Sequence, residues 1–210
     1  MYVGPDIVQD GLVAVFDAGS TRSYPGTGTV WYNLIGTVNG TLSASSIGTT
    51  TAGTMTFDGV DDTLNIVLAS LVSSDFTVIG VSGKVAGSNG RLISARSNNF
   101  LLGHHGTGSR KYYSEGWVAS SYSDSSNDVH IYCGTGDISG DVYSFREDNV
   151  NYTQTASGGS QGPNGFALGS FQNGSEYGTG TITVLLVYNR VLTDAEIDQN
   201  FNAQKNRFGV

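Results

Sequence analysis

The sequence predicts an all-β protein, an antiparallel jelly-roll sandwich that carries one short C-terminal helix. Short runs of β-branched and aromatic residues recur along the 210 residues, separated by turn signals at the spacing typical of a sandwich. The chain has 30 glycines and 11 tyrosines but only three prolines, a composition typical of many strands and tight turns. Because no linker or internal repeat is visible, we expect residues 1–9 to form an N-terminal arm and residues 10–210 one domain.

The first expected strand, at 10–19, is apolar on both faces from Leu12 to Phe16, as in a strand inside a sandwich. A stretch from 53 to 66 is expected to be a hairpin whose two arms each turn apolar side chains inward. The remaining expected strands and strand pairs are 31–36, 39–42, 76–85, 90–95 with 100–104, 111–118, 129–134, 142–146 with 151–155, 166–170 and 181–190.

The helix is expected to begin directly after Thr193. Thr193 is an N-cap residue and Glu196 follows three residues later, the spacing of a capping box. Leu192 and Ile197 occupy the two positions of a hydrophobic staple, and Gly209 is expected to stop the helix. The apolar side chains of this helix, at Ile197, Phe201 and Phe208, form only a narrow stripe. The helix is therefore expected to pack with this stripe against a β-sheet.

Composition and charge exclude several classes of protein. The net charge is −8 and no basic cluster occurs, so binding to nucleic acid through its phosphates is not expected. No apolar segment approaches about 18 residues, so no membrane span is expected. No signal peptide is visible, and we expect synthesis in the cytoplasm without Sec export. The single cysteine, Cys133, permits no internal disulfide and is interpreted as a small buried hydrophobe.

Three groups of segments together resemble a known pattern. They are GLVAVFDAGS (11–20) with YPGTGTVW (24–31), FDGVDD (57–62), and VYNRVLTDAEI (187–197) with NFNA (200–203) and RFG (207–209). They resemble the laminin-G-like (pentraxin-like) branch of the concanavalin A-like lectin/glucanase superfamily, in the form found in virion appendages and structural proteins of tailed bacteriophages, cyanophages among them. Two segments depart from that pattern: 129–134, with His130 at a Trp-Tyr-His-type entry, and 147–150, where an Asn-Gly hairpin is more usual.

This resemblance implies two curved antiparallel sheets whose first and last strands are adjacent. It also implies a virion structural or adhesion protein of a tailed (cyano)phage: a capsid decoration or a tail- or head-fibre component. The partners then expected are other virion proteins, further copies of the chain and host-surface glycans. The location expected is the virion.

The region from 112 to 122 is rich in aromatic residues, and sugars stack on flat aromatic faces. Tyr112, Trp117 and Tyr122 are therefore the candidate carbohydrate-binding residues. The alternative is that strand geometry turns about half of the aromatic side chains of this region into the core. For the same reason the adjacent His104 and His105 are expected to face opposite ways and not to share one metal ion.

The densest carboxylate cluster is Asp58, Asp61 and Asp62. Three carboxylates close to turn carbonyls suit Ca²⁺, and some members of the resembling family bind calcium on a loop rim. The same residues also suit an ordinary turn in which Asp side chains accept local N–H groups and Gly59 supplies a positive φ. The sequence leaves both interpretations open.

No catalytic carboxylate pair is recognisable. The four glutamates are Glu115, Glu147, Glu176 and Glu196, and none fits the Glu-x-Asp-x-x-Glu pattern of the laminarinase-type enzymes of this fold. Glu147 and Asp148 are neighbours and are expected to diverge on a strand. We therefore expect a protein that is not an enzyme. The alternatives are a glycan-degrading enzyme (depolymerase) whose distant carboxylates meet in a groove, and a free carbohydrate-binding module.

Overall fold

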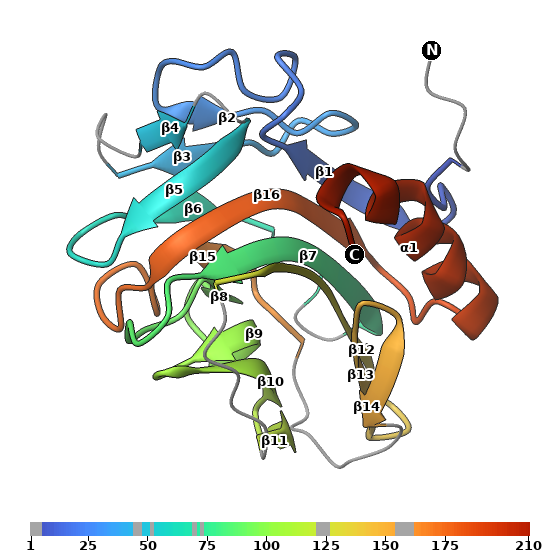
Figure 1. Ribbon diagram of the computed structural model, residues 1–210. Helices are drawn as coiled ribbons and strands as arrows, with labels where there is room; N and C mark the ends of the chain where they lie inside the picture. Colours follow the sequence, from blue (N-terminus) through green and yellow to red (C-terminus); the bar gives the residue numbers. More distant parts are fainter. Residues whose placement is uncertain are drawn as a thin grey trace.

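The computed structural model describes residues 6–43, 48–50, 53–68, 71, 74–120, 127–153 and 162–210. These residues form sixteen β-strands and one α-helix (Figure 1), which confirms the predicted all-β class with a C-terminal helix. The elements are β1 (Leu12–Asp17), β2 (Val30–Trp31), β3 (Gly40–Leu42), β4 (Gly48–Thr50), β5 (Thr54–Asp58), β6 (Leu64–Ile66), β7 (Phe76–Lys84), β8 (Ile93–Ala95), β9 (Phe100–His105), β10 (Gly108–Ser114), β11 (Trp117–Ala119), β12 (Val129–Asp137), β13 (Val142–Glu147), β14 (Val150–Thr153), β15 (Phe166–Leu168), β16 (Thr179–Tyr188) and α1 (Asp194–Phe208).

The strands form two antiparallel sheets of eight strands each. Sheet A has the order β14-β13-β12-β7-β16-β5-β4, and β1 pairs with the second half of β16. Sheet B has the order β11-β10-β9-β8-β15-β6-β3-β2. The pairing of β1 with β16 places the first and last strands side by side, as the resemblance implied. Figure 1 shows β16 and β7 as long curved strands at the centre of sheet A.

The main core lies between the two sheets and is rich in aromatic side chains. Trp31 is fully buried and its ring lies 5.4 Å from that of Phe16. Phe100 of β9 packs edge-to-face on both Phe76 and Phe166, at 6.0 and 6.2 Å between ring centroids. Edge-to-face rings add specific geometry to the burial of apolar area, so these rings fix how the two sheets face each other.

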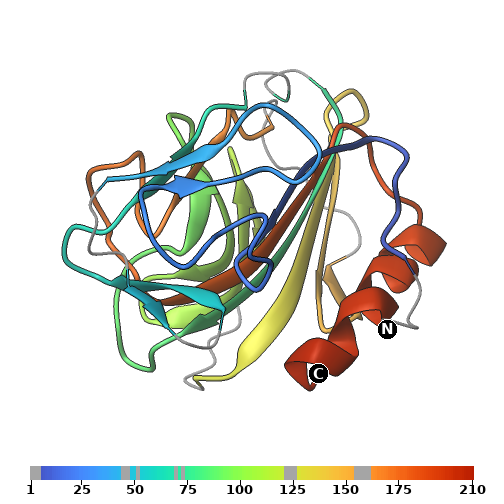
Figure 2. The ribbon, with the colours of Figure 1, turned by 90° about the horizontal axis from the view of Figure 1, so that it is seen from above.

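A second apolar cluster lies on the other face of sheet A, under α1. Val15, Ile79, Ile131 and Leu186 turn outward from their strands and are buried with Ile197 of the helix. Figure 2 shows α1 lying along this face, on the side of the molecule away from β9 and β10. The strands under the helix are therefore buried on both faces, which is why 12–16 and 181–188 are apolar at nearly every position.

The start and end of α1 match the prediction. The Thr193 side chain accepts from the Glu196 backbone N–H, and the Glu196 carboxylate accepts from the Thr193 backbone N–H, which completes the capping box. The staple residues Leu192 and Ile197 are both buried. Gly209 adopts a left-handed conformation with φ 74° and donates its N–H to the Lys205 carbonyl.

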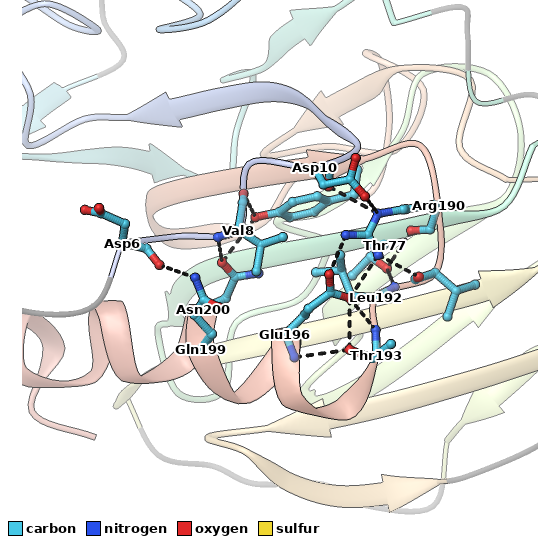
Figure 3. Close-up of polar contacts among 12 residues, drawn as sticks. Asp6, Val8, Asp10, Thr77, Arg190, Leu192, Thr193, Glu196, Gln199 and Asn200 are labelled. Carbon is cyan, nitrogen blue, oxygen red and sulfur yellow. Dashed lines mark hydrogen bonds and ion pairs between the residues drawn. The ribbon is translucent and has the colours of Figure 1, made fainter.

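Residues 6–10 lie against the helix (Figure 3). The Val8 N–H donates to Oδ1 of the fully buried Asn200 at 2.9 Å. The Tyr188 hydroxyl donates to the Val8 carbonyl at 3.0 Å, and the Gln199 side-chain amide donates to the Asp6 carbonyl at 2.7 Å. These contacts join the beginning of the described chain to the end of β16 and to α1.

Arg190 connects the same three segments. Its guanidinium makes two hydrogen bonds to the Glu196 carboxylate, at 2.6 and 2.9 Å, and an ion pair with Asp10 at 3.0 Å. The Thr77 hydroxyl of β7 donates to the Arg190 carbonyl and accepts from the Leu192 N–H, both at 2.9 Å. The turn between β16 and α1 is therefore held by side chains from three different parts of the sequence.

The expected hairpin at 53–66 is wrong in one respect. Met55 and Phe57 on one arm and Leu64 and Ile66 on the other are all buried in the core, as expected. The two arms, however, do not pair with each other. β5 pairs with β4 and β16 in sheet A, whereas β6 pairs with β3 and β15 in sheet B. Both arms point inward because they face each other across the core.

Candidate functional site

The candidate site lies on the outer face of sheet B, where β9, β10 and β11 are adjacent. Period-2 alternation sorts the side chains of these strands. Phe100, Leu102 and Tyr112 face the core and are fully buried, whereas Tyr113 is half-buried and Trp117 is 43% exposed. The antiparallel register pairs Tyr113 with Trp117, so the two outward aromatic residues lie side by side.

Trp117 is held between two other rings. The Tyr113 ring stands perpendicular to it, with centroids 5.2 Å apart, and the His105 ring is inclined at 72° with centroids 5.3 Å apart. Both neighbours present edges to the indole, which is the favourable arrangement for aromatic quadrupoles. The three rings are clustered but not coplanar, so the site offers one exposed indole supported by two rings.

An ion pair from a separate part of the chain lies beside these rings. The Arg91 side chain is 6% exposed and its Nε donates to Oε2 of Glu176 at 2.7 Å. Arg91 also donates to the Asn99 side chain at 2.7 Å and lies over the ring of Phe171, 4.1 Å from its centroid. The same Glu176 oxygen is 3.6 Å from Nε2 of His105, so the ion pair and the ring cluster form one surface.

A pocket of about 420 Å³ opens at this point. This volume lies within the range of small-molecule sites in proteins. Its walls combine backbone at two glycines with polar side chains from three segments, and they are formed by Asn89, Gly90, His105, Gly106, Glu176 and Tyr177. Gly90 has φ 96°, and a Cβ there would lie 2.1 Å from the Tyr177 carbonyl oxygen, so only glycine permits this close approach.

Burial and nearby cations favour the uncharged form of His105. Desolvation is the main cause that lowers the pKa of His105; the positive charge of Arg91 lowers it further, and the Glu176 carboxylate opposes this shift. A neutral imidazole has one donor and one acceptor nitrogen. The pocket therefore combines an acceptor carboxylate with a ring that can donate or accept, and the exposed indole of Trp117 lies against that ring outside the pocket.

We call Arg91, His105, Tyr113, Trp117 and Glu176 the Trp117 surface. Of the predicted aromatic residues that the structure describes, Tyr112 and Trp117, only Trp117 belongs to it. Tyr112 is fully buried and its hydroxyl donates to the Thr135 carbonyl at 3.0 Å. The structure therefore removes Tyr112 from the surface, because alternation on β10 presents its neighbour Tyr113 instead. Tyr122 lies outside the described residues.

The sequence analysis did not assign Arg91 or Glu176 to a site. The alternation of side chains along a strand could have indicated that either Tyr112 or its neighbour Tyr113 faces outward. No sequence signal, however, could have joined Glu176 to Arg91, because they are 85 residues apart and meet only in the folded chain.

The predicted calcium ligands form a turn of the expected kind. Asp58 Oδ1 accepts from the Val60 N–H at 2.8 Å, Asp62 Oδ2 accepts from the Asp58 N–H at 3.0 Å, and Gly59 has φ 81°. One carboxylate oxygen each of Asp58, Asp61 and Asp62 lies within 4.8 Å of the others. Burial is the main cause that raises the pKa of Asp62. The turn interpretation is confirmed, and calcium binding stays a prediction.

Comparison with known proteins places the fold. No family model matches the sequence, and no curated protein matches it closely enough to count as a relative. Among solved structures, Trypanosoma rangeli sialidase in complex with sialic acid matches with a TM-score of 0.65 at 15% identity. The match covers 97% of this chain but only 36% of the sialidase chain, so this chain spans about a third of that protein.

Two further solved structures are similar. Domain 4 of AbnA, a GH43 extracellular arabinanase from Geobacillus stearothermophilus, in complex with arabinotriose, matches with a TM-score of 0.58 at 15% identity, over 94% of this chain and all of that one. The binding domain of botulinum neurotoxin serotype D matches with a TM-score of 0.65 at 12% identity, over 93% of this chain and 52% of that one. At these identities the likeness shows the fold alone, a sandwich of two antiparallel β-sheets.

One sequence-based conclusion is wrong as it was drawn. The missing Glu-x-Asp-x-x-Glu pattern led us to expect a protein that is not an enzyme. Several of the similar solved structures are sialidases, at 15–17% identity, so a fold like this one also occurs within the chains of glycan-active enzymes. The absence of that one pattern therefore does not separate this chain from glycan-active proteins.

Among the residues that the structure describes, the single helix α1 is neither long enough nor apolar enough to cross a bilayer.

Proposed function

We propose that this chain is a glycan-binding domain and that the Trp117 surface is its binding site. The observation that carries the proposal is the exposed indole of Trp117, which packs against the Tyr113 and His105 rings and lies beside a polar pocket of about 420 Å³. The indole is 43% exposed, so part of its large apolar area is available to a ligand from solution.

The chemistry of the surface suits a sugar. The apolar C–H face of a pyranose or furanose ring can lie on the indole of Trp117. Its hydroxyl groups can donate to the Glu176 carboxylate and exchange hydrogen bonds with the neutral His105 ring and the exposed Asn89 amide. Arg91 is itself buried and holds Glu176 in place with two hydrogen bonds, at 2.7 and 3.5 Å. The acceptor is therefore fixed before a ligand arrives, which lowers the ordering cost of binding.

The comparisons support a sugar ligand at the level of the fold. One similar structure, the arabinanase domain, was solved with arabinotriose, and its whole length is covered by this chain. The sialidase was solved with sialic acid. These ligands belong to those proteins, and they guide the choice of glycans for a first screen: arabino-oligosaccharides and sialylated glycans.

The test is a glycan array followed by calorimetric titration of the best ligand. We expect Trp117→Ala to weaken binding about tenfold or more, which corresponds to about 1.4 kcal/mol, because the stacking surface is lost. Tyr32→Ala is the matched control, since Tyr32 is 44% exposed but lies outside the Trp117 surface. Equal affinities of Trp117→Ala and the unmodified chain would refute the site. Product analysis of the same incubations shows whether bound glycans are also cleaved.

We further propose that the domain works on a phage particle, as a capsid decoration or a tail- or head-fibre component that contacts host glycans. The support is the sequence resemblance over residues 10–209 and the sugar-compatible surface. Mass spectrometry of purified particles of the phage that encodes this chain tests the location, and light scattering of the purified chain tests the expected homo-oligomer. A chain absent from particles would refute the virion assignment and leave the glycan proposal intact.

A further inference from the structure

A second cluster of chemistry-bearing side chains lies where β12 and β13 of sheet A face β10 of sheet B, and it shares no residue with the Trp117 surface. Nδ1 of His130 is 2.6 Å from Oδ2 of Asp148 and 3.8 Å from Oε1 of Glu147. Arg110, on β10, donates from Nε to the same Glu147 oxygen. One donor atom each from His130, Glu147 and Asp148 lies within 4.8 Å of the other two.

The turn between β13 and β14 produces this convergence. Asp148 and Asn149 both have positive φ, 47° and 65°, the conformation of a type I′ hairpin turn. The Asp148 N–H donates to the Ile131 carbonyl, and the Ile131 N–H donates to Asp148 Oδ1, both at 2.9 Å. We expected the Glu147 and Asp148 carboxylates to diverge. That expectation is wrong because Asp148 has left the strand and its side chain turns back toward His130.

The Glu147 carboxylate is not fully satisfied by the residues around it. Its side chain is only 2% exposed, and within the described part of the chain its Oε2 atom has no hydrogen-bond partner. A buried carboxylate oxygen without a partner carries a substantial desolvation cost. A ligand that accepts a lone pair from this carboxylate would remove that cost.

We propose that His130, Glu147 and Asp148 form a binding site for one divalent transition-metal ion of the zinc class. An imidazole nitrogen with two carboxylates suits zinc and its neighbours, whereas calcium and magnesium prefer oxygen ligands alone. The all-carboxylate turn at residues 58–62 lacks such a nitrogen and lacks an unsatisfied buried group of this kind.

The distances require little rearrangement. With zinc bonds of about 2.0–2.2 Å to nitrogen and oxygen, tetrahedral ligand atoms stand about 3.3 Å apart. His130 Nδ1 is now 2.6 Å from Asp148 Oδ2 and 3.8 Å from Glu147 Oε1, so each of these two distances has to change by less than about 1 Å. The ion takes the place of the proton that His130 and Asp148 now share, and Arg110 stays on Glu147 as an outer partner that orients the carboxylate.

The site would be open on one side. The His130 and Asp148 side chains are 13% and 25% exposed, whereas Glu147 is buried beneath them. Three protein ligands leave a fourth tetrahedral position for water or for a small anionic ligand from solution. The cluster is therefore suited to hold an accessible ion, which distinguishes it from a closed structural zinc site.

The test is calorimetric titration of the chelator-treated full chain with ZnCl₂, together with visible absorption after addition of CoCl₂. We expect one ion per chain and a d–d absorption band typical of four-coordinate Co²⁺. Asp148→Asn should weaken binding at least about 100-fold. This change removes the charge but keeps the turn, because asparagine tolerates a positive φ. His130→Gln is the second variant, and circular dichroism checks that each variant is folded.

Two control variants locate the ion. The double change Asp58→Asn with Asp61→Asn removes the acidic turn, and His105→Gln removes the other exposed imidazole; both should leave zinc affinity unchanged. The proposal is overturned if the unmodified chain binds neither ion at several-fold molar excess, or if binding survives in both Asp148→Asn and His130→Gln.

Discussion

Replacing Asn200 with alanine tests how the N-terminal segment is attached to the fold. Asn200 is fully buried on α1 and accepts hydrogen bonds from the Val8 N–H at 2.9 Å and the Tyr188 hydroxyl at 3.2 Å. The Tyr188 hydroxyl keeps a second acceptor, the Val8 carbonyl at 3.0 Å, but the Val8 N–H loses its partner. An unsatisfied buried donor costs about 1–3 kcal/mol, so Asn200→Ala should destabilise the chain by about that amount.

The assay is urea unfolding followed by tryptophan fluorescence, with thermal unfolding in parallel. For a chain of this length about 1 kcal/mol corresponds to about 2–4 °C in Tm. Asn202→Ala is the matched control, because Asn202 is exposed on the same helix and gains the same alanine helix propensity without losing a buried contact. If the two variants differ by less than about 0.5 kcal/mol, the contact does not anchor the segment and the reasoning is refuted.

Two further predictions concern pH and backbone conformation. The hydrogen bonds from Arg190, together with those from Thr193, lower the pKa of Glu196 to about 2. Its contribution to stability should therefore be complete above its ordinary value of 4.5 and be lost as the pH falls toward 2, and Glu196→Gln should flatten this part of the stability profile measured by urea unfolding. Gly90→Ala should lower Tm by more than Gly87→Ala, because both glycines have positive φ but only at Gly90 would a Cβ meet backbone, at 2.1 Å; equal shifts in Tm would contradict the clash.

The local features of the sequence predicted the elements well. The capping box at Thr193 and Glu196, the left-handed stop at Gly209 and the opposite facing of His104 and His105 all depend on neighbours within a few residues. Such signals are reliable because a helix cap is formed by residues three or four positions apart, and because side chains alternate along any strand whatever the strand pairs with. Alternation along the strand also predicted that Tyr112 and Tyr113 would face opposite ways. The sequence could not tell that Tyr112 would face the core.

The candidate sites were predicted only in part, for a physical reason. Glu176 meets Arg91 across 85 residues of chain, and Arg110 meets Glu147 across 37. These pairs depend on which strand of which sheet each residue joins, and strand order carries no local signature. The convergence of Glu147 with Asp148 depended on the type I′ turn, whose two positive φ values overrode the divergence expected of neighbours on a strand.

The sequence by itself determined the class of fold and the position and caps of the helix, because composition and short-range patterns suffice for these. The tertiary structure alone decided that β5 and β6 belong to opposite sheets, that Trp117 stands exposed beside a polar pocket, and that a histidine and two carboxylates meet at the end of the sandwich. Each of these depends on long-range strand pairing, which the hydrophobic pattern permits in several arrangements and which only the packed core selects.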